Sequence, residues 1–298
     1  MSTSDQPVLP VLPGVEHADA VVGGVRIRYA QAGTGRPVVL LHTFPQHSYA
    51  WRRVIPLLAE DFRVVCPDLR GAGESDAPAG GYGTAERAAD ILGLLDALGL
   101  ERAILVGHGW GAWAGFRVCL DAPERVEGYV SLGMTHPWPP FGAAARNAWR
   151  QWHTAFWEYP VLGSRVLRHW PSFTRFVLRH WAGDASALSR EDVHAYAEAV
   201  REAPRARAGQ RLHWGYVVHD IPKLLFGGRS EATLTVPTRI LIGARDAVVR
   251  PSMARDAASR CDDLEIRTVP GAGHLLPEER PEAVADAVRT LAHRARNE

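Results

Sequence analysis

The stretch "AILVGHGWGAWAGF", residues 103–116, has the pattern of a buried strand, a tight turn and the first turns of a helix. Three glycines, Gly107, Gly109 and Gly111, stand at alternate positions of the turn. A turn this tight forces its central residue towards positive φ, a conformation that glycine adopts almost freely. We therefore expect a strand, turn and helix here, with Gly109 at the sharpest point of the turn.

Strand-like and helix-like segments alternate on both sides of this stretch. Residues 20–33 alternate apolar and polar side chains around a Gly-Gly pair, which is typical of a β-hairpin. Segments with helical spacing are 49–60, interrupted at Pro56, then 85–100 and the C-terminus from about Glu279. Apolar runs typical of buried strands occupy 36–42, 62–67, 101–107, 125–134, 237–243 and 264–273. This alternation predicts an α/β fold with a mostly parallel central sheet flanked by helices.

The middle of the chain differs from the rest. Residues 138–222 contain no clear buried-strand run, but they hold seven of the ten tryptophans in segments with helical spacing. Sheet-like patterning resumes after this segment. We therefore expect a core formed by 1–137 and 223–298, with 138–222 inserted as a helical cap, or lid.

Composition excludes several classes of function. The formal net charge of +1 gives no electrostatic bias towards polyanions, so we expect neither nucleic acid nor a membrane as partner. The three cysteines lack metal-ligand spacing, and we expect no metal and no cofactor. The first residues lack a basic start followed by an apolar run, so a cytoplasmic location is the default, with a homodimer left open.

Three separated segments carry a family resemblance. In chain order they are "LLHTFPQHSYAW" (40–51), then "PDLRGAGESDAP" (67–78) leading to "VGHGWGA" (106–112), and finally "ILIGARDAVV" (240–249) with "VPGAGHLLPEERPE" (269–282). Together they resemble the α/β-hydrolase fold family, and specifically its epoxide hydrolase and haloalkane dehalogenase branch. That family places a nucleophile on the turn between a strand and a helix, an acid after a later strand and a histidine near the end of the chain.

The resemblance implies roles for four residues. His274 matches the general base of the family, and Asp246 matches the acid that orients it. Phe44 and Trp110 match positions whose backbone N–H groups stabilise developing negative charge. We expect His274 and Asp246 to form a hydrogen-bonded pair facing Gly109.

Two departures from the family matter. The family has glycine where this chain has Thr43, whose branched side chain restricts the backbone. Gly109 stands where the family has a nucleophilic aspartate, and glycine cannot form a covalent ester. His42 and His108 fall at histidines that the family often has, where a supporting role is expected. His42 and Thr43 are also candidates for contact with the substrate.

The insertion indicates the kind of substrate. Its aromatic side chains predict a hydrophobic, aromatic or polycyclic small molecule such as an epoxide. For Trp170 and Trp181 simple packing is the preferred interpretation. The candidate substrate-binding residues of the lid are Phe156, Trp157, Tyr159 and Tyr216.

Several interpretations of Gly109 stay open. The favoured one is an enzyme in which His274 and Asp246 act as a general acid/base pair without a covalent nucleophile. The alternatives are a ligand-binding pseudoenzyme, or an epoxide hydrolase or dehalogenase that the change to Gly109 has inactivated; Gly109→Asp should then restore covalent chemistry. "GHGWGA" also fits a dinucleotide-binding turn, but the next strand ends "VSLGMTH" without the acidic residue that such a site needs.

Overall fold

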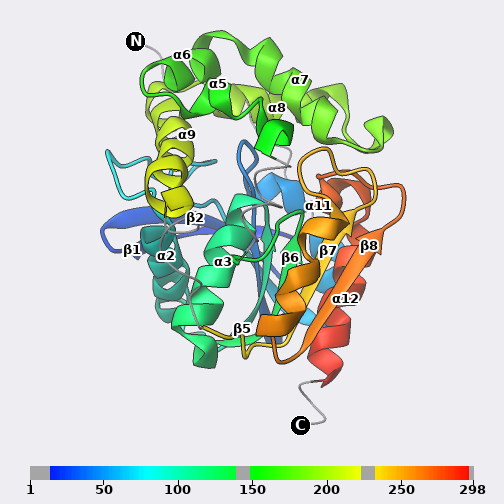
Figure 1. Ribbon diagram of the computed structural model, residues 1–298. Coiled ribbons are helices and arrows are strands. Elements are labelled where there is room, and N and C mark those ends of the chain that lie inside the picture. The colour runs from blue at the N-terminus through cyan, green and yellow to red at the C-terminus, as the bar shows by residue number, and fades with distance from the viewer. Residues whose placement is uncertain (1–13, 139–147, 223–231, 295–298) are drawn as a thin grey trace.

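The structure, a computed structural model, describes residues 14–138, 148–222 and 232–294. Eight strands form one sheet in the order β1-β2-β4-β3-β5-β6-β7-β8 (Figure 1). The predicted α/β architecture is confirmed. The strands are β1 (Glu16–Val22), β2 (Val25–Ala32), β3 (Arg36–Leu41), β4 (Phe62–Pro67), β5 (Ala103–His108), β6 (Val126–Leu132), β7 (Thr238–Gly243) and β8 (Leu264–Val269).

The pairing of the strands follows their sequence patterns. The first two strands form the predicted antiparallel hairpin, and β2 also runs antiparallel to β4. Every other neighbouring pair is parallel. All residues of β5 and β7 are buried, because a parallel sheet covered on both faces leaves neither face of its central strands in water.

Helices cover both faces of the sheet, and alternate residues of a strand point to opposite faces. In β3, Val39 and Leu41 join the cluster that includes α2 (Thr84–Ala97) and α3 (Trp110–Asp121). Their neighbours Val38 and Leu40 join the cluster on the other face. That face is covered by α1 (Ile55–Leu58) and α12 (Pro281–Arg294), with the short α11 (Leu276–Glu279) leading into α12.

All regular elements described between 148 and 222 are helical. They lie above the carboxyl ends of the strands in Figure 1, as a layer over the start of α3. The predicted ends of the lid adjoin 139–147 and 223–231, which lie outside the described residues. The elements are η3 (Ala148–Gln151), α5 (Ala155–Glu158), α6 (Leu162–His169), α7 (Pro171–Trp181), η4 (Ala185–Ala187), α8 (Arg190–Ala199), α9 (Ala203–Gly215) and η5 (Tyr216–Asp220).

The predicted helix over 49–60 is wrong in detail. Two short elements replace it, the 3₁₀ helix η1 (Ser48–Trp51) and α1. Pro56 does not interrupt a helix but lies in the first turn of α1, where its missing N–H has no helical partner to lose. Other short 3₁₀ elements lie in the connections to strands: η2 (Pro123–Arg125) precedes β6, and η6 (Pro251–Met253) and η7 (Arg255–Arg260) lie between β7 and β8.

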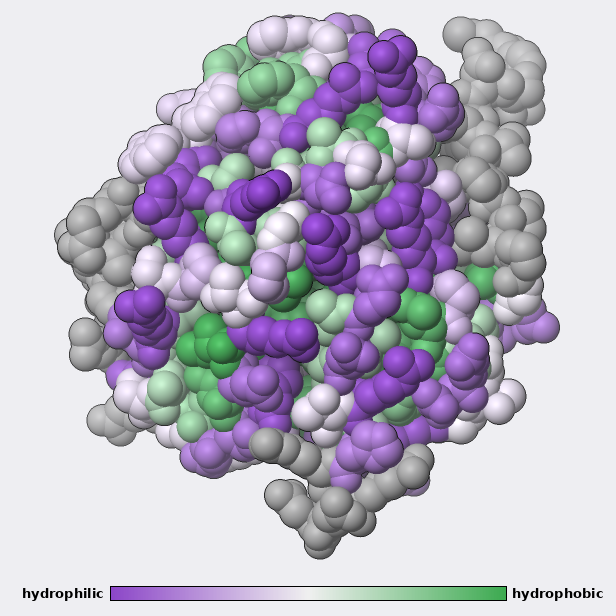
Figure 2. Space-filling model, turned by 90° about the vertical axis from the view of Figure 1, so that its right-hand side faces the viewer, coloured by the Kyte–Doolittle hydropathy of each residue, from purple (hydrophilic) through white to green (hydrophobic). Residues whose placement is uncertain are grey.

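The outer surface has a mixed character. On the face shown in Figure 2, hydrophilic residues are spread widely, with hydrophobic residues in smaller groups between them. None of the helices in the described residues combines the length and the apolar composition that crossing a membrane requires.

Candidate active site

The predicted turn at Gly109 joins β5 to α3. Gly109 has φ 49° and ψ −112°, so the expected positive φ is present. Its N–H donates to the carbonyl of Leu132 at the end of the neighbouring strand β6, and its carbonyl accepts from the N–H of Trp113 in α3. The turn is therefore tied both to the sheet and to its helix. A side chain at 109 would bear a strain of about 1 to 3 kcal/mol.

His274 and Asp246 lie together at the carboxyl ends of the sheet. Nδ1 of His274 is 2.9 Å from Oδ2 of Asp246, and both residues are buried. The carboxylate keeps a proton on Nδ1, so Nε2 carries the lone pair. Nε2 lies 3.7 Å from the position that a Cβ at Gly109 would take. The geometry thus aims Nε2 of His274 at the turn that carries Gly109, where the sequence resemblance predicts the position of a nucleophile.

Backbone groups fix both members of this pair. The second carboxylate oxygen of Asp246 accepts hydrogen bonds from the N–H groups of Val248 (2.7 Å) and Val249 (2.8 Å). The N–H of His274 donates to the carbonyl of Trp181 in the lid, at 2.8 Å. The Trp181 ring also packs edge-on against His274, with centroids 5.1 Å apart. We expected Trp181 only to pack the lid on the core. Its carbonyl and its ring also hold His274 in place.

His108 supports the same pair from below. Its Nε2 lies 2.8 Å from the carbonyl oxygen of His274, which makes Nε2 the protonated nitrogen and donor. Burial lowers the pKa of His108 well below its ordinary value, so the ring is neutral. His108 thus positions the backbone of His274, in line with the supporting role expected for it.

Thr43 fills the space that a side chain at Gly109 would need. A Cβ at Gly109 would lie 2.2 Å from Oγ1 of Thr43 and 2.9 Å from its Cβ, both too close for real atoms. The same hydroxyl accepts the N–H of Trp110 at 3.2 Å. One of the two backbone donors expected to stabilise negative charge is therefore engaged inside the protein. The two departures from the family pattern, at 43 and 109, meet in space.

His42 has a structural role in the loop after β3. Its Nε2 accepts the N–H of Leu69 at 2.9 Å, and its Nδ1 donates to the carbonyl of Thr43 at 2.9 Å. Burial is the main cause that lowers the pKa of His42 to about 4. Both ring nitrogens are committed, so His42 shapes the loop that carries Thr43 and Phe44.

Two of the four lid residues lie at the site. Trp157 is fully buried and packs edge-on against the ring of Phe44, with centroids 5.4 Å apart. Tyr216 packs edge-on against Trp110 at 5.2 Å, and burial raises the pKa of its phenol. Tyr216 therefore stays a neutral O–H group at physiological pH.

The other two lid candidates face outward. The side chain of Phe156 is 38% exposed and contacts Phe173, with ring centroids 5.0 Å apart, while Tyr159 is 57% exposed. The structure does not bring them to Gly109. The sequence of this segment fixes neither the start of α5 nor the face of this short helix that turns inward.

Sequence reasoning missed two residues at the site, His213 and Arg87. The buried ring of His213 in α9 packs between Phe44 and Trp110, at 5.0 Å from each ring centroid. Arg87 in α2 donates to the carbonyl of Trp110 at 2.7 Å. Neither belongs to a motif. The sequence did contain one signal, an arginine in the same helical stripe as Ile91 and Leu94.

Comparisons with known proteins agree with this architecture. The soluble epoxide hydrolase of Corynebacterium sp. (strain C12) is 28% identical over 282 residues, covering 91% of this chain and 95% of that protein. Haloalkane dehalogenase 2 of Mycobacterium tuberculosis (strain ATCC 25618 / H37Rv) is 31% identical over 276 residues, covering 88% and 90%. The solved structure of the epoxide hydrolase CorEH without ligand matches with a TM-score of 0.80 and 28% identity, covering 93% and 98%.

A family model described as alpha/beta hydrolase fold matches residues 36–281, which span most of the sheet, the lid and the loops of the candidate site. The matched residues contain the strands β3 to β8 and the turn at Gly109 between β5 and α3. The chain therefore belongs to the α/β-hydrolase fold family, in the branch whose members include epoxide hydrolases and haloalkane dehalogenases.

Proposed function

We propose that the chain is an epoxide-hydrolase-like enzyme that works without a covalent nucleophile. The observation that carries this proposal is the pair of His274 and Asp246, 2.9 Å apart and buried, with Nε2 aimed at the Cα side of Gly109. A histidine–aspartate pair that served only the fold would not need Nε2 of the histidine directed at the turn between β5 and α3, which we call the elbow. The proposed substrate is a hydrophobic, aromatic or polycyclic small molecule with a strained or polarised bond.

The proposed step uses water. Nε2 of His274 accepts a proton from a water molecule, and the water oxygen attacks a ring carbon of the epoxide. The carbon–oxygen bond of the ring breaks, and the alkoxide takes a proton from the imidazolium or from the Tyr216 hydroxyl. Asp246 stabilises the imidazolium that forms. General base catalysis contributes about 10² to 10⁴-fold, so a strained substrate suits this mechanism.

A second candidate function is a ligand-binding protein without turnover. One hydrogen bond favours this second function. The Trp110 N–H donates to Thr43 Oγ1, so it is not free to stabilise an oxyanion during a reaction. A binder would keep the aromatic lid for contact with its ligand. Its affinity would then be indifferent to the basicity of His274.

The test compares turnover and binding in His274→Ala, with His194→Ala on the exposed face of α8 as the matched control. Wild type and control should hydrolyse members of a panel of aryl epoxides, while His274→Ala should lose at least 100-fold in kcat. Binding of an aryl diol, followed by tryptophan fluorescence, should change by less than about threefold. No turnover by wild type across the panel, with diol binding intact, would leave the ligand-binding function standing instead.

A further inference from the structure

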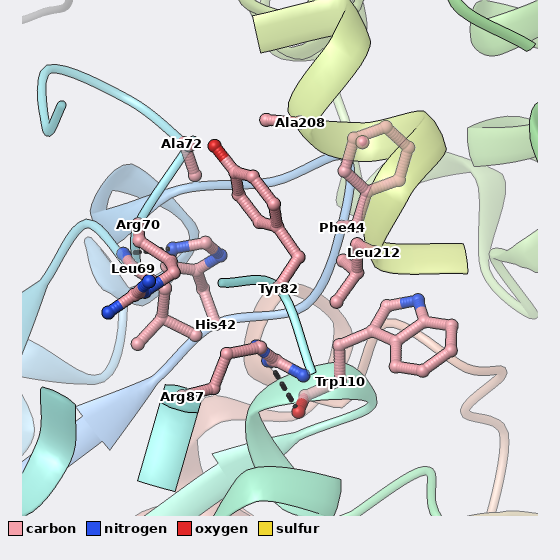
Figure 3. Close-up of a pocket in the computed structure, with 12 residues that line it drawn as sticks. His42, Phe44, Leu69, Arg70, Ala72, Tyr82, Arg87, Trp110, Ala208 and Leu212 are labelled. Atoms are coloured by element: carbon pink, nitrogen blue, oxygen red, sulfur yellow. Dashed lines mark hydrogen bonds between the residues drawn. The ribbon is translucent and has the colours of Figure 1, made fainter. Parts of the chain in front are cut away.

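A small cavity lies beside the elbow, between the core and the lid. Its volume is about 30 Å³, and its walls include the aromatic side chains of Phe44, Tyr82 and Trp110, with Leu212 from α9. Figure 3 shows the guanidinium of Arg87 below Tyr82 and next to the backbone of Trp110. A cavity of this size accommodates one or two waters or a group of a few atoms.

Arg87 is a buried cation that lines this cavity. It is only 3% exposed, and one nitrogen, Nη2, donates to the carbonyl of Trp110 at 2.7 Å. Burial is the main cause that lowers its pKa from 12.5 to about 10, so the side chain stays charged at neutral pH. Buried charges are usually paired, because an unpaired charge loses its hydration without compensation.

The described part of the chain gives Arg87 no ion pair. The two carboxylates that influence it, Asp90 and Asp220, already have other partners. Asp90 accepts both nitrogens of a fork from Arg70, and Asp220 accepts the hydroxyl of Thr84 at 2.8 Å. Arg87 therefore lines the cavity as a cation, and none of the carboxylates in the described residues forms an ion pair with it.

The other polar side chains of the cavity wall are in use. Both ring nitrogens of His42 hold backbone groups, and the hydroxyl of Tyr82 donates to the carbonyl of Pro78 at 2.8 Å. The guanidinium of Arg70 is bound by Asp90 and by the carbonyl of Gly81. Among the described lining residues, Arg87 thus supplies the cationic donor that has no carboxylate partner.

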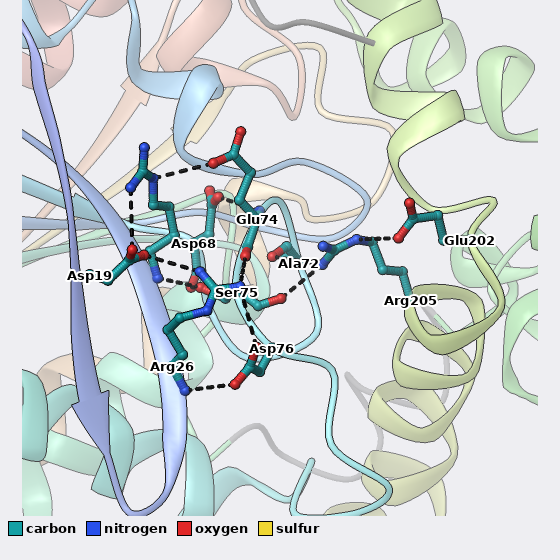
Figure 4. A network of polar contacts seen from close by, with 10 residues as sticks. Asp19, Arg26, Asp68, Ala72, Glu74, Ser75, Asp76, Glu202 and Arg205 are labelled. Atoms are coloured by element: carbon teal, nitrogen blue, oxygen red, sulfur yellow. Dashed lines mark hydrogen bonds and ion pairs between the residues drawn. The ribbon is translucent and has the colours of Figure 1, made fainter. Parts of the chain in front are cut away.

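A rigid loop forms the outer wall of the cavity. The carboxylate of Asp68 accepts the N–H group of Glu74 at 2.7 Å, which closes the loop that follows β4 (Figure 4). It also accepts the N–H group of Ser48 at 2.7 Å. Arg205 in α9 donates to the carbonyl of Ser75 at 2.9 Å, so the same loop is also fastened to the lid. The cavity is therefore a built feature and keeps its shape between core and lid.

The elbow adds to the positive potential. The N-terminus of α3, a helix of 12 residues, carries a partial positive charge next to Arg87, and glycine at 109 supplies no carboxylate to oppose it. A cation placed at a helix N-terminus is unfavourable for folding alone. An anionic group of a ligand would compensate both charges at once.

We propose that Arg87 and this cavity bind the carboxylate group of a small molecule. A carboxylate has the planar, two-oxygen shape that a guanidinium fork matches, and it fits a cavity of this volume, whereas a ring does not. The apolar rings of Phe44 and Trp110 then face the hydrocarbon part of the molecule. The substrate is thus a hydrophobic acid, and only this last statement rests on the proposed function.

The test measures binding without turnover, in carboxylate-free buffer at constant ionic strength. The probes are acetate and benzoate, with benzamide as the uncharged counterpart of benzoate and chloride as the background anion. Wild type should show a saturable change in tryptophan fluorescence and a rise in Tm with benzoate, and a weaker response to acetate. Arg87→Met should bind benzoate at least tenfold more weakly, and Arg117→Met, an exposed arginine on α3, should bind like wild type.

Two further arms keep the proposal falsifiable. Arg87→Lys keeps a charge but loses the fork, and we expect at least tenfold weaker binding of benzoate in a folded variant. His194→Ala, on the exposed face of α8, should bind benzoate like wild type. Equal affinity in the Arg87 variants, equal binding of benzamide, or a chloride response as strong as that of acetate would each overturn the carboxylate site. Benzoate binding through Arg87 in a protein that turns over no epoxide would refute the proposed function alone.

Discussion

Thr43 and Gly109, the two positions at which the sequence departs from the family that it resembles, lie next to each other in the structure. The hydroxyl of Thr43 lies where the first side-chain atom at 109 would be, and it takes the N–H of Trp110. Glycine, which has no Cβ, thus fits at position 109 without any movement of the Thr43 side chain. This contact argues against the expectation that Gly109→Asp alone restores covalent chemistry, because the Cβ of the new side chain would collide with Thr43.

We predict that Gly109→Asp alone is destabilised and forms no covalent adduct. The cost combines the strain of a side chain at φ 49° with the clash against Thr43, and should reach at least about 2 kcal/mol in urea unfolding. Thr43→Gly combined with Gly109→Asp should regain part of that stability. With His274→Gln added to block hydrolysis, the double replacement should form an adduct with an aryl epoxide, detected by intact mass spectrometry.

The controls for this prediction are Thr43→Gly and wild type, neither of which should form an adduct. An adduct in Gly109→Asp that still carries Thr43, without loss of stability, would show that the threonine moves aside freely. The two positions would then be independent.

His42 gives the stability a dependence on pH. Its pKa of about 4 in the folded protein lies below the ordinary value of 6.5, so the unfolded chain takes up the proton first as pH falls. The stability that the neutral His42 side chain contributes to the folded protein is therefore fully present above pH 6.5, and it is lost as the pH falls towards 4. Between pH 7.5 and 4 the free energy of unfolding should fall in wild type. We predict that this fall is smaller by about 3 kcal/mol in His42→Asn, measured by urea titration.

The matched control is His17→Asn, because His17 is exposed on β1. It should leave the pH dependence as in wild type. A wild-type stability that is flat from pH 7.5 to 4, or a slope that His42→Asn does not change, would contradict the buried neutral state of His42.

At the scale of the elements, one arginine fastens the lid to the core. Arg52, just after η1, pairs with Asp192 of α8 at 2.7 Å and with the fully buried Glu278 of α11. Tyr196 of α8 donates to the same Glu278. This network spans the interface next to the carboxyl ends of the strands, so it sets how the lid sits over His274.

We predict that Arg52→Met lowers the unfolding free energy by about 3 kcal/mol, because it leaves the buried Glu278 without its cation. Chemical denaturation at pH 7.5 is the measurement. Arg117→Met breaks an exposed pair with Asp121 on α3 and should cost less than about 1 kcal/mol. Similar small losses in the two variants would show that the Arg52 network contributes little to stability.

The elements also show what the sequence could predict. Buried strands such as β5 and β7 were predictable because most of their residues are apolar or small, and all of them are buried in a sheet that helices cover on both faces. The segment 49–60 was not, since its apolar spacing fits one helix as well as two short turns. The outward position of Phe156 depends on how α5 rotates against α6 and α7, which pairwise packing decides.

On the scale of the whole molecule, the sheet gathers loops that are far apart in the chain. The order of Gly109, Asp246 and His274 could be predicted from motifs, because each motif follows its own strand and parallel strands end at one edge. The approach of Thr43 to Gly109 and the position of Arg87 against Trp110 could not. They arise from the packing of the β3 loop and of α2 against the elbow, which no local pattern encodes.

The central claim is that His274 and Asp246 act without a covalent intermediate. The direct measurement is a single turnover in ¹⁸O-labelled water, with wild-type protein in excess over an aryl epoxide that it hydrolyses. We predict that the diol carries one labelled oxygen from the first turnover, while the intact mass of the protein stays unchanged, with neither substrate nor ¹⁸O attached. An unlabelled diol, together with ¹⁸O or a substrate adduct on the protein, would contradict this mechanism.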